Sequence, residues 1–233
     1  MPCTLPASLA DAAVCRGSFH AVLGGEVEDT AFADFSAALQ KAQAEGRILT
    51  ASLFRYENHL FFYAEGLNRP FTPQGLCPAL DAALLPWPPA LGEAEPRPWA
   101  AMQPYFYHDV PTTAADWQQG RCPQRRRGRI ALLPPDSWCS YMEHHLRIVT
   151  EGLVEGDRWH LICVQVGVLF SYLEEPRTNV NIRHQPGAHS PELDAWIAAD
   201  PESHFARFTP EQKANPDSGH NFVFLPRIAG TED

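Results

Sequence analysis

Tyr141 and His145 are the two residues whose types and spacing best fit chemistry. They lie four positions apart in a segment with a helical apolar pattern, so both side chains would occupy one helix face, about one turn apart. A tyrosine hydroxyl would then lie beside an imidazole, which exchanges protons near neutral pH. This pair is the candidate catalytic site. Because Trp138 and Ile148 share the stripe, a packed core is the competing interpretation.

Other residues offer surfaces for a ligand. Trp159 opens a strand-like run and supplies a flat apolar face on which the C–H face of a sugar ring can pack. His204 and Phe205 form a second candidate group, and Asn215 and Asp217 carry donors and acceptors suited to several hydroxyls. The competing interpretations are a barrel-lining tryptophan, a core phenylalanine and an ordinary turn.

A metal site is not expected from the histidines. His144, His145 and His160 are near one another in sequence, but the ligands of a metal ion must converge on it. Adjacent histidines on a helix point apart, so we expect no metal here.

The elements that would position these residues follow a recognisable order. Residues 129–133 read as a strand, Pro135 and Asp136 can begin a helix, and residues 157–165 and 168–174 read as a hairpin. Helices near 190–198 and 200–208 and a strand at 222–228 follow. This is the βαββαβ order of a ferredoxin-like unit.

The first half of the chain repeats this order at a spacing of about 110 residues, too long for a solenoid repeat. Residues 60–65, Leu-Phe-Phe-Tyr-Ala-Glu, return at 169–174 as Leu-Phe-Ser-Tyr-Leu-Glu, and residues 20–23 correspond to 130–133. The sequence therefore predicts an α+β fold of two tandem ferredoxin-like units that pair their sheets into a pseudo-dimeric α/β barrel. We expect an N-terminal unit at 1–110, whose site is degenerate, a connector at 111–128, and a C-terminal unit at 129–233 that carries the site.

The second unit resembles the L-rhamnose mutarotases, small sugar-epimerising enzymes that form a dimeric α/β barrel. The features that match, in order, are the helix start at Pro135-Asp136, the Tyr141 and His145 pair, Trp159, and residues 169–174 and 214–217. The family usually has a Trp-Trp pair where this chain has His204-Phe205, and a longer segment between His145 and Trp159. These departures leave the substrate open.

The resemblance implies an isomerase that interconverts the anomers of a free aldose or deoxyhexose by acid/base proton transfer, with no cofactor. It implies that His145 transfers the proton. It also implies that the sugar is contacted by Tyr141, Trp159, His204, Phe205, Asn215 and Asp217.

Composition restricts the partners. The net charge of -10 argues against a nucleic-acid partner, because phosphate binding needs a basic surface. No apolar run is long enough to span a membrane, and no leader pattern is evident. The six cysteines lack C-x-x-C spacing. We expect a cytoplasmic protein that binds a small-molecule sugar, as an intrachain pseudo-dimer able to oligomerise further.

Two other functions remain open. The chain can be a non-catalytic protein that binds a carbohydrate or another small molecule, since the first half lacks the Tyr-x-x-x-His pair. It can also be a barrel oxygenase or a haem-binding relative, because unrelated chemistries share this architecture.

Overall fold

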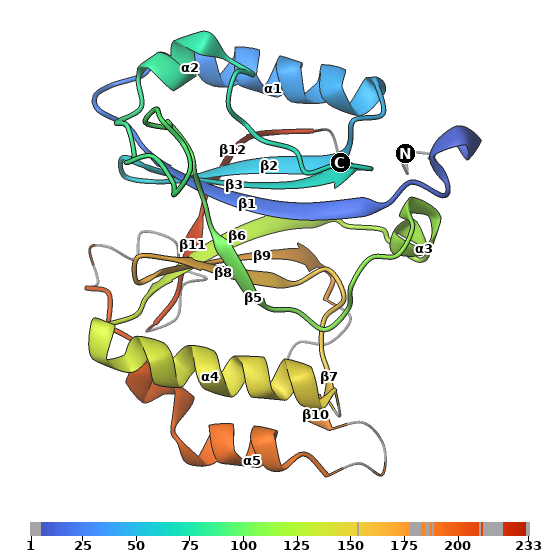
Figure 1. Ribbon diagram of the computed structural model, residues 1–233, viewed down its shortest axis with the longest axis vertical. Helices are drawn as coiled ribbons and strands as arrows, with labels where there is room; N and C mark the ends of the chain where they lie inside the picture. Colours follow the sequence, from blue (N-terminus) through green and yellow to red (C-terminus); the bar gives the residue numbers. More distant parts are fainter. Residues whose placement is uncertain are drawn as a thin grey trace. The chain divides into compact units, whose positions relative to one another are not determined.

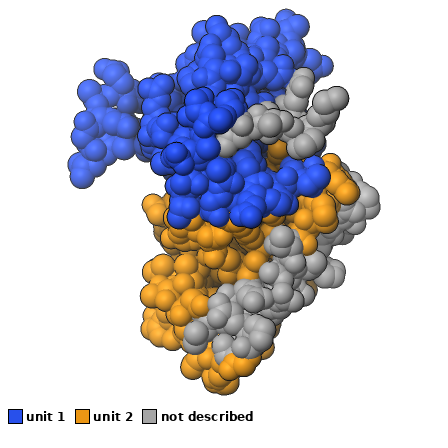
Figure 2. Space-filling model, turned by 90° about the vertical axis from the view of Figure 1, so that its right-hand side faces the viewer, with its two compact units in different colours: residues 1–102, 111–123, 226–233 blue, residues 103–110, 124–225 orange. Residues whose placement is uncertain are grey.

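The chain forms two compact units, coloured separately in Figure 2. The structure, a computed structural model, describes residues 6–152, 154–177, 183–184, 187, 189–209, 211 and 221–231. Unit 1 comprises residues 1–102, 111–123 and 226–233, and unit 2 comprises residues 103–110 and 124–225. Each unit is built on a five-stranded antiparallel sheet, which confirms the α+β class.

Unit 1 has the order β1 (Val14–Val22), α1 (Asp29–Ala44), β2 (Ile48–Tyr56), β3 (His59–Leu67), α2 (Pro78–Ala82) and β4 (Ala100–Ala101). The 3-10 helix η1 (Ala7–Leu9) precedes β1, and the connector contributes α3 (Ala114–Gln118). The sheet order is β12-β2-β3-β1-β4, and α1 and α2 cover one face of it (Figure 1). This is the predicted βαββαβ order.

The helix α1 packs on this sheet through one apolar stripe. Phe35, Leu39 and Ala42 are fully buried along it, as a helix with one covered face requires. They join a core to which the sheet contributes Leu60, Phe62 and other alternate residues of β3.

Unit 2 contains β5 (Gln103–Phe106), β6 (Arg125–Leu132), α4 (Pro135–Glu151), β8 (Leu161–Gln165), β9 (Val168–Glu175), α5 (Pro191–Ala198) and β11 (Val223–Leu225). Its sheet order is β11-β6-β9-β8-β5, and β7 (Val154–Glu155) and β10 (Arg183–His184) form a separate pair. The helices α4 and α5 lie on one side of the sheet (Figure 1). The expected helix at 200–208 is only the 3-10 helix η2 (Pro201–His204), because the backbone is extended at Phe205 and Ala206 bridges to Leu132.

The two halves of the chain exchange edge strands. The strand β5 directly follows β4 of unit 1 in sequence but pairs with β8 of unit 2. The strand β12 (Arg227–Gly230) follows the last strand of unit 2 but pairs with β2 of unit 1. Division of the sequence at residues 110 and 129 could not reveal this exchange, because strand pairing between segments distant in sequence leaves no local pattern.

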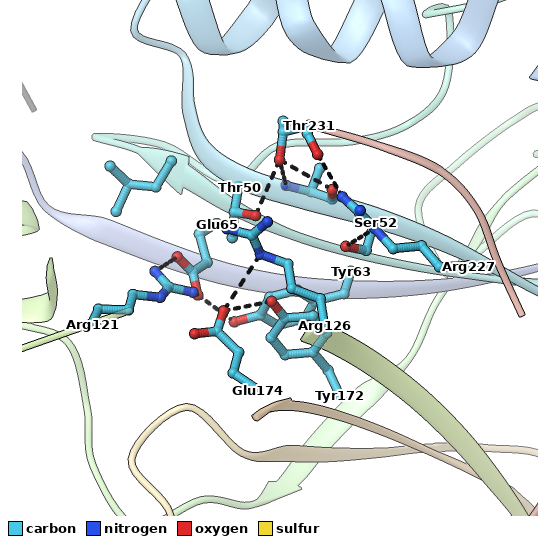
Figure 3. A network of polar contacts seen from close by, with 12 residues as sticks. Thr50, Ser52, Tyr63, Glu65, Arg121, Arg126, Tyr172, Glu174, Arg227 and Thr231 are labelled. Atoms are coloured by element: carbon cyan, nitrogen blue, oxygen red, sulfur yellow. Dashed lines mark hydrogen bonds and ion pairs between the residues drawn. The ribbon is translucent and has the colours of Figure 1, made fainter. Parts of the chain in front are cut away.

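A repeated polar motif supports the internal duplication. In unit 1 the Tyr63 hydroxyl donates to Glu65 Oε1 at 2.7 Å, and in unit 2 the Tyr172 hydroxyl donates to Glu174 Oε1 at 2.7 Å (Figure 3). Each glutamate lies opposite an arginine across its sheet, Arg16 in unit 1 and Arg126 in unit 2. The two sheets therefore have the same register.

The Glu65 carboxylate is held by a buried arginine of the connector. Arg121 donates to both of its oxygens, at 2.7 and 2.9 Å, and both side chains are buried. Burial alone would raise the pKa of Glu65, but the Arg121 guanidinium, with help from Arg16 and Tyr63, brings it below its usual value. The pair fixes the connector, through Arg121, to the sheet of unit 1.

The described residues include no helix long and apolar enough to cross a membrane.

Candidate functional site

The side of the unit 2 sheet that faces the helices differs chemically from the equivalent side in unit 1. Phe19 lies opposite Phe62 in unit 1, and Arg129 lies opposite Ser171 at the same register position in unit 2. In unit 1 the two rings pack at a centroid distance of 6.3 Å, and Phe62 also packs on Phe35 of α1. A guanidinium and a hydroxyl therefore replace two aromatic rings.

The helices show the same change. The buried positions 35, 39 and 42 of α1 have the spacing of the buried positions 141, 145 and 148 of α4. Tyr141 and His145 of α4 thus stand where α1 has Phe35 and Leu39. Unit 2 has exchanged four apolar residues for polar ones at positions that in unit 1 contribute to its apolar core, and this difference defines the candidate site.

His145 lies among aromatic rings. Its imidazole is 4.2 Å from the Tyr141 ring, 4.6 Å from Trp196 of α5 and 4.8 Å from Phe106 of β5, between centroids. Tyr105 of β5 is 5.7 Å away. The exchanged strand β5 therefore supplies part of this cluster, together with α4 and α5.

Burial makes His145 a neutral imidazole. Its Nδ1 is 3.0 Å from the carbonyl oxygen of Tyr141, and because a carbonyl only accepts, Nδ1 carries the proton. Burial lowers the pKa of His145 to about 4; the hydrogen bond to the Tyr141 carbonyl opposes this shift, and His144, His204 and His108 make smaller contributions that lower the pKa. At neutral pH the other ring nitrogen, Nε2, is therefore unprotonated and able only to accept a hydrogen bond.

The Tyr105 hydroxyl of the cluster stays protonated. Burial, followed by the neighbouring Tyr141 hydroxyl, raises the pKa of Tyr105 well above its usual value. The Tyr105 and Tyr141 rings meet edge to face at 6.1 Å. The site thus holds hydroxyl donors, the unprotonated Nε2 of His145 as an acceptor, and the guanidinium of Arg129.

The structure brings His204 and Phe205 to the same cluster. Their rings lie 5.9 and 5.0 Å from that of Tyr141, and His204 is 5.4 Å from Trp196. His204 Nε2 is 3.5 Å from the Ser140 hydroxyl, at the limit of a hydrogen bond. Four predicted site residues, Tyr141, His145, His204 and Phe205, are therefore neighbours in space.

Several buried polar atoms of this region have no hydrogen-bond partner among the described residues. Ser171 Oγ, on the sheet, and His204 Nδ1, on η2, are among them. The Ser171 side chain is 1% exposed. A buried polar atom without a partner costs about 1 to 3 kcal/mol, so a water or a ligand that hydrogen-bonds to either atom would be stabilised there.

The remaining predicted residues are placed differently. Trp159 is buried in the turn before β8, and it is not a member of the core cluster that contains Tyr141, Trp196 and Phe205. Asn215 and Asp217 lie outside the described residues. A role for these three in binding stays a prediction.

The residues that sequence reasoning missed are Ser171, Arg129, Tyr105 and Trp196. Ser171 was visible in the repeat itself, as the one position of residues 169–174 where a hydroxyl replaces a phenylalanine. The positions at which the two copies differ in chemical type therefore indicated the site, and the positions at which they match indicated only the shared fold. Tyr105 had no such signal, because its strand joins the second sheet from the first half of the chain.

The described residues contain no group of three or more His, Cys, Asp or Glu side chains arranged to hold a metal ion. The histidines of the candidate site are instead packed against aromatic rings.

Comparison with known proteins assigns no family. No family model matches the sequence, and no curated protein matches it. Three solved structures share the arrangement at low similarity. A "putative monooxygenase" from Lactobacillus acidophilus has 6% identity and a TM-score of 0.41 over 94% of this chain and 96% of its own.

The other two structures are equally distant. A "putative monooxygenase" from Fusobacterium nucleatum has 9% identity and a TM-score of 0.39 over 94% of both chains. An anthrone oxidase-like protein has 7% identity and a TM-score of 0.38 over 94% of this chain and 92% of its own. These scores are too low to transfer an activity to this chain.

The expected membership of the L-rhamnose mutarotase family is wrong, and with it the isomerase activity. The three similar structures carry other descriptions, monooxygenase and anthrone oxidase-like. The physical reason for the error is that the matching features are general ones. A helix that packs on a sheet in a βαββαβ unit presents residues four apart to that sheet whatever the unit binds. The fold remains compatible with small-molecule binding.

Proposed function

We propose that unit 2 binds a small, mainly apolar molecule that has a ring and a hydroxyl group, between its sheet and the helices α4 and α5. The observation that carries the proposal is the exchange of Phe19, Phe35, Leu39 and Phe62 of unit 1 for Arg129, Tyr141, His145 and Ser171 of unit 2. Unit 1 fills the corresponding space with apolar side chains. The fold itself therefore does not require polar side chains at these positions. Buried polar groups destabilise a core unless they are hydrogen-bonded.

The surroundings favour a ring over a fully polar ligand. Tyr141 and His145 face Phe106, Trp196 and Phe205 at ring distances of 4.6 to 5.2 Å. Small-molecule sites are usually lined in this way, with mostly apolar and aromatic side chains and a few polar groups that fix orientation. The polar groups are hydroxyls, the neutral imidazole of His145 and the guanidinium of Arg129, and a ligand hydroxyl can hydrogen-bond with each of them.

The protonation state of His145 favours binding over proton transfer. A general base works best when its pKa lies near the operating pH, and burial holds the pKa of His145 at about 4. Its Nε2 is therefore a weak base but a good hydrogen-bond acceptor. A ligand hydroxyl is the natural donor to it, and Ser171 Oγ and His204 Nδ1 can accept or donate further hydrogen bonds.

A matched pair of probes tests the proposal. 2-Naphthol and 2-methoxynaphthalene share one ring system and differ in the hydroxyl hydrogen. Because a buried acceptor left without its donor costs about 1 to 3 kcal/mol, we expect 2-naphthol to bind between about 5-fold and about 150-fold more tightly. Titration calorimetry measures both affinities directly.

Three variants complete this test. His145→Leu, which installs the residue of unit 1, should abolish the preference for 2-naphthol, and Ser171→Phe should abolish the binding of both probes by filling the space. Leu39→Met in unit 1 is the matched control and should bind as the unaltered protein does. If neither probe binds, or if Ser171→Phe binds 2-naphthol with unchanged affinity, the site is not where we place it.

A further inference from the structure

Unit 1 has a cavity of its own, of about 460 Å³, which lies within the range of small-molecule sites. Its walls come from β1, from residues 72–74 and from residues 93–97, which follow α2. Phe19 and Trp99 provide aromatic surface, and Thr72, Gln74, Glu93 and Arg97 provide polar groups. All of these residues belong to unit 1.

The cavity lies at the place on the fold that corresponds to part of the unit 2 site. Phe19 has the register position that Arg129 has in unit 2. Deeper in unit 1, the rings of Phe35, Phe62 and Trp99 pack together at centroid distances of 5.7 to 6.2 Å. The inner part of the space is thus filled, and a ligand of unit 1 would occupy only the outer part, where it remains partly in water.

The polar groups of the cavity have unused hydrogen-bonding capacity. Arg97 Nε is buried and has no hydrogen-bond partner among the described residues. Arg97 Nη1 is 3.8 Å from Glu93 Oε2, too far for a hydrogen bond. The Glu93 carboxylate accepts one hydrogen bond, from the backbone of Ala90 at 2.9 Å, and a carboxylate has further lone pairs.

The charges of the lining indicate the class of ligand. One arginine, Arg97, and two glutamates, Glu93 and Glu95, line the cavity. Charges of both signs are therefore present, and the lining favours neither an anionic nor a cationic ligand. The guanidinium, the carboxylates, the Gln74 amide and the Thr72 hydroxyl together offer donors and acceptors in similar number. A molecule with several hydroxyls can donate to the acceptors and accept from the donors. The C–H face of its ring can pack on the partly exposed ring of Phe19.

We propose that this cavity of unit 1 binds a neutral polyhydroxylated ring of the size of a free monosaccharide. This site is separate from the one proposed in unit 2. Its ligand carries polar groups around the ring, whereas the ligand proposed for unit 2 is mainly apolar.

Saturation-transfer NMR with D-glucose, D-galactose, D-xylose and myo-inositol tests the proposal, with benzoate and benzylamine as singly charged ring probes. We expect saturable binding of at least one polyol, weakened about tenfold or more in Arg97→Ala and in Gln74→Ala, as the loss of one good hydrogen bond to a ligand predicts. Gln40→Ala removes an exposed amide of α1 outside the cavity and should leave the affinity unchanged. Saturating 2-naphthol should also leave it unchanged, because that probe reports on unit 2.

Three results would overturn the proposal. The first is that no polyol of the panel gives saturable binding. The second is that both cavity variants bind the polyol as tightly as the unaltered protein. The third is that benzoate or benzylamine binds in the cavity while the polyols do not, which would assign it to a charged ligand.

Discussion

The stability of unit 2 should depend on pH through His145. An unfolded chain has a histidine pKa near 6.5, and burial lowers the pKa of the folded His145 to about 4. Because the unfolded state binds the proton more tightly, stability is fully present above pH 6.5, falls as the pH drops, and levels off below about pH 4. The full difference is worth about 3 kcal/mol, of which about 2 kcal/mol is already lost at pH 5.

The variant His145→Leu isolates this contribution. Leucine does not titrate, and it is the residue that α1 has at the equivalent position, Leu39. Between pH 7 and pH 5 the unaltered protein should therefore lose about 2 kcal/mol more than the variant, or about 4–8 °C of melting temperature for a chain of this size. Thermal unfolding of both proteins at the two pH values, followed by calorimetry, measures the difference.

A second histidine serves as the control. His189 is exposed, and its contact with Asp194 lies at the surface, where ion pairs contribute little to stability, so His189→Leu should keep the pH dependence of the unaltered protein. If His145→Leu loses as much stability on acidification as the unaltered protein, His145 is not held neutral by burial. The account of its Nε2 as a hydrogen-bond acceptor would then lose its basis.

Glu65→Gln should lower the free energy of unfolding by about 3 to 5 kcal/mol, because Arg121 would stay buried beside a neutral partner; urea unfolding measures this, and a loss below about 1 kcal/mol would contradict it. Removal of residues 226–233 deletes β12 and should speed amide hydrogen exchange in β2, its partner strand, and not in β9; unchanged protection of β2 would mean that the pairing contributes no stability.

The comparison of the two units explains how one fold can carry different sites. Both sheets keep the same register and the same Tyr-x-Glu motif, at Tyr63 and Glu65 and again at Tyr172 and Glu174. The residues that face the helices can differ between the two units, provided that side chains or a bound ligand fill the space between the sheet and the helices. Unit 1 fills its inner space with Phe62 and its neighbours, and unit 2 has Ser171 in that place.

Much of the fold could be predicted from the sequence, because the relevant information is local. The apolar spacing on 29–44 and 135–151 gives amphipathic helices, and the alternation along 59–67 and 168–175 gives strands. The repeat of residues 60–65 at 169–174 then gives two units of one kind. The membership of β5 and β12 could not be predicted in this way, since both are short and their pairing partners are distant in sequence.

The candidate site was predicted in part. The spacing of Tyr141 and His145 places both on the covered face of α4, and the structure places the rings of the predicted residues His204 and Phe205 beside that of Tyr141. The family and the reaction inferred from the same residues were wrong, because a helical stripe reports packing geometry and not the ligand. Tyr105 and Trp196 could not be added without the fold.

The sequence by itself determined which residues are polar at positions where its own first half is apolar, since that comparison needs only the two copies. Only the tertiary structure decided that these positions face one another across the sheet and α4, and that an exchanged strand brings Tyr105 and Phe106 to them. The physical reason is that burial is a collective property. The low pKa of His145, and the lack of a hydrogen-bond partner for Ser171 Oγ among the described residues, arise from side chains that distant elements bring together, and no local pattern encodes those neighbours.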